Sequence, residues 1–495
     1  MPTRNDYLIK LSNELFSTQF LGFTPTSNST KPPHIANGLF RECIGEYWDT
    51  EMIHKWIVSE QKENATSSEE IVSEFKSILA RKDLENINNI KKLRFLLNEI
   101  FNPDNTVYPK YDFSSYNITT HWLIHKSVAP EAKIGRFIFD ILAKQIDGKR
   151  SPAIELINKA LKEENDDLSN LIRPILAFPS LDTKKHDNEV RYASEDEITW
   201  DSCKQTIRDG FDNLANNLIA VGEDKNSLTV LQRMVNYSCF ATYYYLVQSD
   251  AAIYNKERIP MVFDAGLDLE SIKKSSEKSF IFAKNAVEDF FIDSIIKILK
   301  NEEQLTDSDR DCQRFIEDMC FSTIDREEDI KPSIKSFYLS FIKDGSSPIH
   351  SLAKALQLVL YTCEYKSNSP SDFCRVLGVR CGLIAPKGNR AKVKRYLFDS
   401  FILETLTLSI MSQDDIKYGI EFKELGEKFT KFYNILLGTD AHTEYSILQK
   451  SNISQSTPGD LRGDLTLNAQ SIAEMYLSLG LGHKYADGVT IIQWR

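Results

Sequence analysis

Three residues in the second half of the chain have the types and spacing of a metal-dependent nuclease site. Glu364 and Lys366 form an E-x-K pattern after the apolar stretch LQLVLYT, and Asp344 lies upstream. Two carboxylates can bind Mg²⁺, and a lysine can assist the water that attacks a phosphodiester. The pattern is short and arises by chance, and the flanking residues fit a helix equally well.

Other candidates for catalysis are weaker. His121 and His125 lie one helical turn apart in HWLIH, but the glutamate of H-E-x-x-H is absent, so two packed histidines are the simpler interpretation. Asp264 follows a short predicted strand, where it serves a turn more often than a metal. The chain has no Gly-rich phosphate loop, nucleophile elbow or paired-cysteine zinc motif. We therefore expect no metal, no cofactor and no self-contained NTPase.

A basic cluster follows the candidate nuclease residues. Two short predicted strands, in RVLGVRCGLIAP and KVKRYLF, flank a turn at residues 386–389. From residue 387 to residue 395 the chain has five basic residues and no acid: Lys387, Arg390, Lys392, Lys394 and Arg395. Clustered cations can neutralise DNA phosphates without reading sequence. The alternative is a hairpin whose charges face only water.

The last predicted elements have the outline of a winged helix. A helix over residues 468–479 precedes HKYADGVTIIQW, in which Asp487-Gly488 predicts a hairpin turn. If this helix enters a DNA groove, Asn468 and Gln470 are candidate base contacts, with His483 and Lys484 on the hairpin. The helix has no lysine or arginine. Protein docking or core packing is therefore the alternative role.

The whole chain is predicted to be mainly α-helical. Helical spacing of apolar residues indicates an N-terminal helical domain at 1–177, a polar linker at 178–197, a mainly helical domain at 198–375 and a small α/β winged-helix-like domain at 376–495. Thr66 with Glu69, or Ser67 with Glu70, can form a capping box. The stretch SLTVLQRMVNYSCFATYYYLVQ is too long for a strand and predicts a buried helix.

The composition of the chain indicates the class of protein and the compartment in which it acts. The net charge is -11, with 42% hydrophobic and 26% charged residues, as in folded soluble proteins. Eight scattered cysteines without a C-x-x-C pair predict reduced thiols. The first residues lack the apolar core of a secretory signal, and no apolar run reaches the roughly 18 residues of a membrane helix. We expect a cytoplasmic protein with no membrane contact.

The segments IPMVFDAG, LGVRCGLIAP, RYLFDSFILETLTLSIM, FTKFYNILLG and LTLNAQSIAEMYLSLGLGHKYADGVTIIQW occur in this order over residues 259–494. This region resembles the C-terminal part of large accessory proteins encoded in bacterial restriction and phage-defence loci. The resemblance implies protein partners such as an ATPase, helicase or nuclease, and supplies no catalytic residue. The resulting hypothesis is a non-enzymatic adaptor or a subunit that binds duplex DNA. Its alternative is the Mg²⁺-dependent nuclease of Asp344, Glu364 and Lys366.

Overall fold

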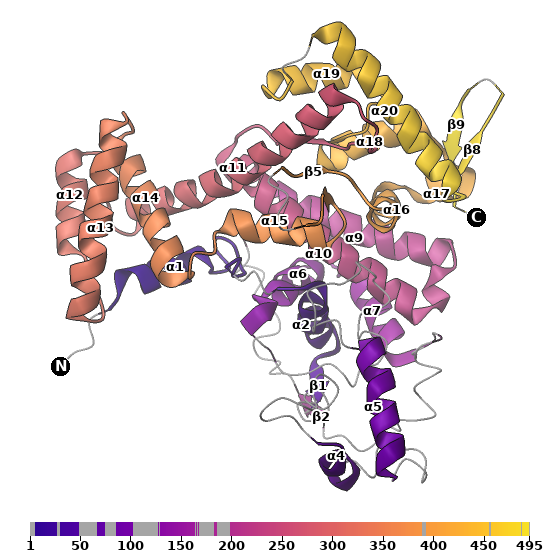
Figure 1. Ribbon diagram of the computed structural model, residues 1–495, viewed down its shortest axis with the longest axis horizontal. Coiled ribbons are helices and arrows are strands. Elements are labelled where there is room, and N and C mark those ends of the chain that lie inside the picture. The colour runs from indigo at the N-terminus through magenta and orange to yellow at the C-terminus, as the bar shows by residue number, and fades with distance from the viewer. Residues whose placement is uncertain are drawn as a thin grey trace.

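The chain folds into a mainly helical structure, as the sequence predicts (Figure 1). The computed structural model describes residues 5–26, 30–48, 67–74, 86–101, 127, 129–163, 165, 167, 183–185, 199–388, 393–454, 457–486 and 488–494. The described strands are two or three residues long and form small sheets. Helix packing therefore provides most of the interior.

The N-terminal part of the chain contributes short helices and one strand pair. They are α1 (Tyr7–Leu15), α2 (Pro32–Ile44), β1 (Glu46–Trp48), α4 (Ser68–Glu74), α5 (Ile87–Phe101), η4 (Ala129–Glu131), α6 (Ile134–Ala143), α7 (Pro152–Glu163) and β2 (Thr183–Lys185). Helices α2 and α6 approach closely, because a Cβ on Gly135 would lie 2.2 Å from the backbone nitrogen of Leu39. Glycine at this position is therefore required by the packing.

Two observations bear on the sequence predictions for this part. The amide of Ser67 donates to Oε2 of Glu70 at 2.7 Å, and the amide of Glu70 donates to Oγ of Ser67 at 3.1 Å, which confirms the second predicted capping box. Strand β2 lies inside the predicted linker 178–197 and pairs antiparallel with β1. The other residues of that stretch lie outside the described part, and the domain boundaries stay predictions.

The middle of the chain is built on two long helices. Its elements are α9 (Ser202–Ala220), η6 (Glu223–Lys225), α10 (Ser227–Tyr254), β3 (Met261–Val262), α11 (Glu270–Asn301), α12 (Asp309–Asp318), α13 (Ile324–Lys343), α14 (Pro348–Val359), η7 (Leu360–Glu364) and α15 (Pro370–Arg380). Residues 233–250 of α10 are all buried, which confirms the predicted buried helix. A helix surrounded on every side needs no polar face, and this explains its aromatic and β-branched composition.

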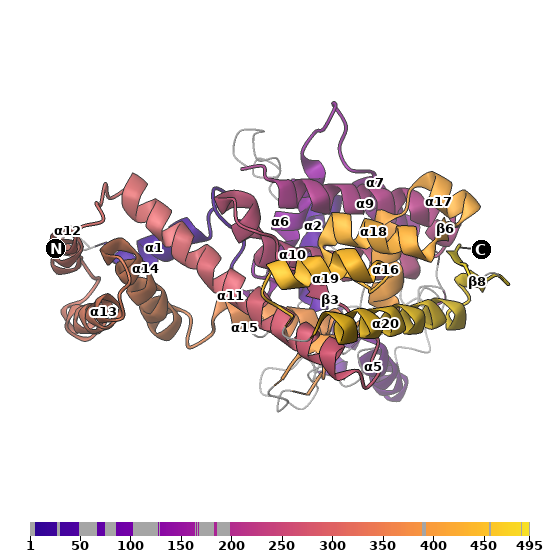
Figure 2. The same ribbon diagram turned by 90° about the horizontal axis from the view of Figure 1, so that it is seen from above.

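Helix α11 connects two ends of the molecule. Its 32 residues span about 48 Å at the usual helical rise. At one end it meets the group formed by α12, α13 and α14, called here the distal lobe (Figure 2). Along the rest of its length it packs against α10, α15 and α20. Within the described residues, no helix has both the length and the apolar character needed to cross a membrane.

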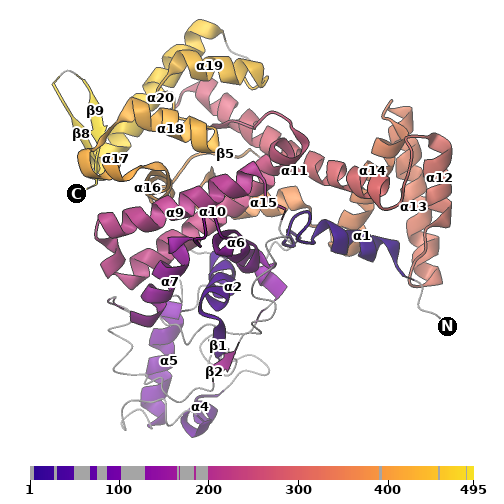
Figure 3. The ribbon, with the colours of Figure 1, turned by 180° about the vertical axis from the view of Figure 1, so that it is seen from behind.

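The C-terminal part combines helices with short strands (Figure 3). Its elements are β4 (Ile384–Ala385), β5 (Arg395–Tyr396), α16 (Ser400–Ile410), α17 (Gln413–Tyr418), β6 (Ile420–Glu421), α18 (Phe422–Tyr433), β7 (Ile435–Leu436), α19 (Ala441–Lys450), α20 (Pro458–Ser478), β8 (Gly482–Lys484) and β9 (Thr490–Ile492). The strand predicted in RVLGVRCGLIAP is mostly helix α15, and its last residues form β4, which pairs with β5. The predicted hairpin is present as β8 and β9, with β6 on the other side of β9.

One hydrophobic core extends through these parts, from Leu8 in α1 to Trp494 after β9. A smaller apolar cluster around Val262 and Leu436 lies where β3 pairs in parallel with β7. This pairing joins the middle of the chain to its C-terminal part. The middle and C-terminal parts of the chain therefore share one packed interior.

Candidate functional site

The structure does not bring the three nuclease-like residues together. Helices α13 and α14 run side by side and are joined by a short loop, so the end of α14 lies near the start of α13. The loop between them lies at the opposite end of α13. Arg326 at the start of α13 contacts Glu364 at the end of η7, whereas Asp344 caps the other end of α13. The 18-residue separation of Arg326 and Asp344 corresponds to about 27 Å. Asp344 and Glu364 therefore cannot share a metal ion here.

Glu364 has a structural partner instead. The guanidinium of Arg326 forms ion pairs with Glu364 and with Asp6, the N-cap of α1. Lys366 is exposed just beyond η7. Through these two ion pairs, the Arg326 guanidinium ties α1 and η7 to α13, and Glu364 has a structural role here.

Clusters of metal-ligating side chains are the other possible basis of a metal site. Over the described ranges, no group of three or more His, Cys, Asp or Glu side chains could hold a metal ion. His121 and His125 lie outside those ranges.

The basic cluster is partly an interior feature. Lys394 is buried, and its ammonium donates to the carbonyl of Pro386 and, at 2.8 Å, to that of Gly388. Burial lowers the pKa of Lys394, and the nearby charge of Arg375 lowers it further. The side chain thus closes the loop after β4 rather than facing a phosphate.

Two other members of the cluster also have internal partners. Nε of Arg395 lies 2.9 Å from Oδ2 of Asp264, a buried carboxylate after β3. Burial raises the pKa of Asp264, and the Gly266 amide and the Arg395 charge oppose this effect. Nζ of Lys387 lies 3.8 Å from Oδ2 of Asp399. The remaining members, Arg390 and Lys392, lie outside the described residues.

The predicted reading helix is the second half of α20, and its first candidate residue faces inward. Asn468 is fully buried, where its amide group donates to the carbonyls of Phe263 and Leu437 and accepts from the amide of Ala265. It cannot reach a base edge in this conformation, because its hydrogen-bonding groups hold the segments after β3 and β7. Gln470 is exposed, and its role as a base contact stays a prediction.

The outer face of α20 and the adjoining hairpin form a second surface, called here the C-terminal face. Its exposed residues on α20 beyond Gly463 are Thr466, Leu467, Gln470, Glu474 and Ser478. On the hairpin, Lys484 forms an ion pair with Glu474 at 3.2 Å, and Tyr485 is 58% exposed. His483 is half-buried. The C-terminal face thus combines polar side chains with the exposed apolar side chains of Leu467 and Tyr485, and the charge of Lys484 is neutralised by Glu474.

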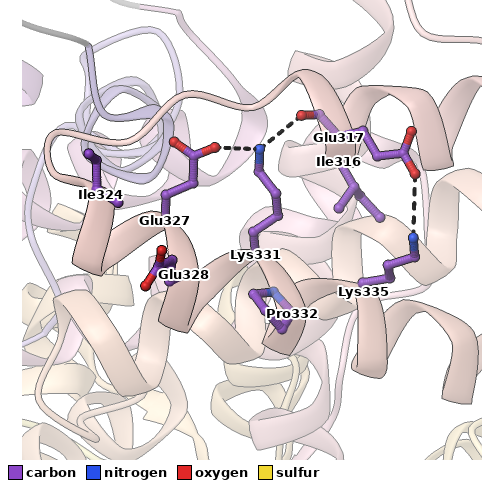
Figure 4. Close-up of a pocket in the computed structure, with 8 residues that line it drawn as sticks. All are labelled: Ile316, Glu317, Ile324, Glu327, Glu328, Lys331, Pro332 and Lys335. Carbon is purple, nitrogen blue, oxygen red and sulfur yellow. Dashed lines mark hydrogen bonds and ion pairs between the residues drawn. The ribbon is translucent and has the colours of Figure 1, made fainter.

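Sequence reasoning missed a groove in the distal lobe, between α12 and α13 (Figure 4). Its volume is about 510 Å³. The apolar part of its lining comes from Ile316, Ile324 and Pro332. Two features of the sequence mark this groove: Pro332 within a helical stretch and Ile324 at the start of that helix, both flanked by charged residues. Neither feature resembles a known motif.

No match was found with any protein family, curated protein or solved structure.

Proposed function

We propose that this chain is a non-catalytic adaptor of a bacterial antiphage defence or restriction complex. In this proposal it acts in the cytoplasm and binds a separately encoded ATPase, helicase or nuclease through the C-terminal face. The observation that carries the proposal is the composition of that face, which exposes Leu467 two helical turns before Glu474 and Tyr485 next to Lys484, while Lys484 and Glu474 neutralise each other. Exposed aromatic and aliphatic side chains with satisfied charges are typical of protein contacts.

We also infer that the C-terminal part is a winged helix. In support, α17, β6, α18, β7, α19, α20, β8 and β9 follow one another, and the strand order of the three-stranded sheet is β6-β9-β8, while β7 pairs with β3. Here α20 takes the place of the recognition helix and the β8–β9 hairpin that of the wing. A winged helix binds DNA in some proteins and another protein in others, so the residues on its surface determine which of the two it binds.

The charge of the surface favours protein over DNA. Phosphate binding depends on lysine and arginine, whereas α20 exposes Glu474 and its Arg462 stacks on Tyr445. Lys387, Lys394 and Arg395 have internal partners, as described above. The net charge of -11 adds a repulsive background for a polyanion. A duplex-binding role would therefore depend on Arg390 and Lys392.

The test is reconstitution with the proteins encoded beside this gene. Leu467→Asp should abolish co-elution of the partner on size exclusion, because a carboxylate would be buried in an apolar contact. Ile281→Asp, at a 53% exposed position on α11, is the matched control and should retain the partner. Salt-dependent binding to duplex DNA that persists in Leu467→Asp, without any protein partner, would overturn the adaptor proposal.

A further inference from the structure

The groove in the distal lobe exposes apolar side chains of α13 to solvent. Ile324 is 67% exposed at the start of α13, and Pro332 lies two turns further along the same helix. Ile316 of α12 lies across from them. Exposed apolar side chains at the rim of a groove cost free energy in water, so covering them would be favourable.

The two lysines of the groove are already neutralised. Nζ of Lys331 lies 2.9 Å from Oε1 of Glu327 and 2.8 Å from the carbonyl oxygen of Glu317. Nζ of Lys335 lies 3.4 Å from Oε1 of Glu317 (Figure 4). Both cations therefore contribute little net positive potential to the groove.

The acids on the same side are not balanced in this way. Glu328 lines the groove, and Asp325 and Asp329 are its exposed neighbours on α13. Within the part of the chain that the structure describes, none of these three carboxylates has an ion pair. The groove therefore exposes the apolar side chains of Ile324 and Pro332 beside the unpaired carboxylate of Glu328, and two further acids lie next to it on α13.

We propose that this groove binds a basic amphipathic helix of a partner protein. The lining residues of α13 run from Ile324 to Lys335, which is about 17 Å, or three helical turns. A helix of that length can place apolar side chains on Ile324 and Pro332 and lysines or arginines on Glu328. The distal lobe and the C-terminal face lie at opposite ends of the molecule (Figure 1), so both can be occupied at once. This inference extends the proposed adaptor function and is tested separately from it.

The probe is an acetylated, amidated helical peptide of leucine and lysine with its leucines on one face. Fluorescence anisotropy should show saturable binding to the full-length chain. Glu328→Lys and Ile324→Asp should each weaken binding at least about tenfold, because one removes the charge match and the other the apolar contact. Both positions are exposed, so the fold should tolerate them.

Glu427→Lys is the matched control, since this exposed acid lies on α18 and changes the net charge equally. It should alter peptide affinity less than twofold. Equal weakening by Glu427→Lys would reveal binding by net charge alone and overturn the proposal. So would binding unaffected by Glu328→Lys, or sedimentation showing a dimer that Ile324→Asp dissociates, since a second copy would then occupy the groove.

Discussion

Nε of Arg326 lies 2.5 Å from Oδ2 of Asp6, across more than three hundred residues of sequence. Asp6 caps α1, where it also accepts from the amide of Leu8, and Arg326 lies in the first turn of α13. The same guanidinium contacts Glu364. One cation therefore joins three segments, which fixes the first helix of the chain to the distal lobe.

Removal of the Asp6 charge should destabilise the protein. Burial alone raises the pKa of Asp6, but the hydrogen bonds from Arg326 and Ser322 outweigh it and the pKa is lowered. Asp6→Asn should reduce the free energy of unfolding by about 2 kcal/mol at neutral pH. Because the folded pKa lies below the unfolded value near 3.8, this contribution is present above that pH and is lost as the pH falls. Urea titrations from about pH 6 down to pH 3 measure it.

The control for this variant is Asp268→Asn, at an exposed position before α11. It should change the free energy of unfolding by less than about 0.5 kcal/mol. A stability difference between Asp6→Asn and wild type that stays constant down to pH 3 would contradict the assigned ion pair.

Asn468 and Gln470 should differ sharply, although both were predicted to contact DNA. Asn468→Ala leaves the Phe263 carbonyl and the Ala265 amide without their buried partner, at a cost of about 2 to 3 kcal/mol. Gln470→Ala removes an exposed side chain and should cost less than about 0.5 kcal/mol. Chemical denaturation of the two variants measures this difference. Equal stabilities would contradict the buried role of Asn468.

The sequence predicted helices and hairpins more accurately than it predicted which side chains are exposed for binding. The long apolar stretch of α10, the Ser67 capping box and the β8–β9 hairpin depend on neighbours in sequence, and the structure has all three. The strand predicted before residue 386 is mostly α15, because a short apolar run fits a buried helix as well as a strand. Only tertiary packing decides between them.

The candidate sites depended on contacts that no local pattern encodes. Lys394 and Arg395 read as surface charge because lysine and arginine are usually exposed. Their partners are the Gly388 carbonyl, within the same hairpin, and Asp264, more than a hundred residues away. The groove was missed for the same reason, since it requires α12 beside α13. Spacing identifies residue types that suit a task, whereas the fold decides which of them are free to perform it.

Charge reversal at Arg395 should impair folding rather than DNA binding. Arg395→Glu would remove the partner of buried Asp264 and place two carboxylates together, at a cost of about 3 kcal/mol. Lys423→Glu, on the exposed side of α18, is the matched reversal and should cost less than about 0.5 kcal/mol. Thermal unfolding compares the two. If Arg395→Glu instead keeps wild-type stability and flattens the salt dependence of duplex DNA binding, Arg395 is a phosphate contact.

Glu444 of α19 lies in a setting that should make stability depend on pH near neutrality. Its side chain is buried and accepts from the amide of Gly438 at 2.7 Å and from that of Asp440 at 3.3 Å. Burial raises the pKa of Glu444 to about 7, and these backbone hydrogen bonds oppose the rise. The protonated carboxyl is therefore favoured in the folded protein at pH values where the unfolded chain has already lost the proton.

The sign of the effect follows from proton binding. Between the ordinary glutamate pKa of 4.5 and the folded value of about 7, the folded state binds more protons, so stability falls as the pH rises. The Glu444 contribution should be fully present below pH 4.5 and should decline by about 3 kcal/mol as the pH passes 7. Glu444→Gln cannot titrate, so subtracting its urea unfolding profile from that of wild type isolates this term. A difference that is flat between about pH 5 and pH 8 would show that Glu444 is ionised in the folded protein throughout, held by the amides of Gly438 and Asp440.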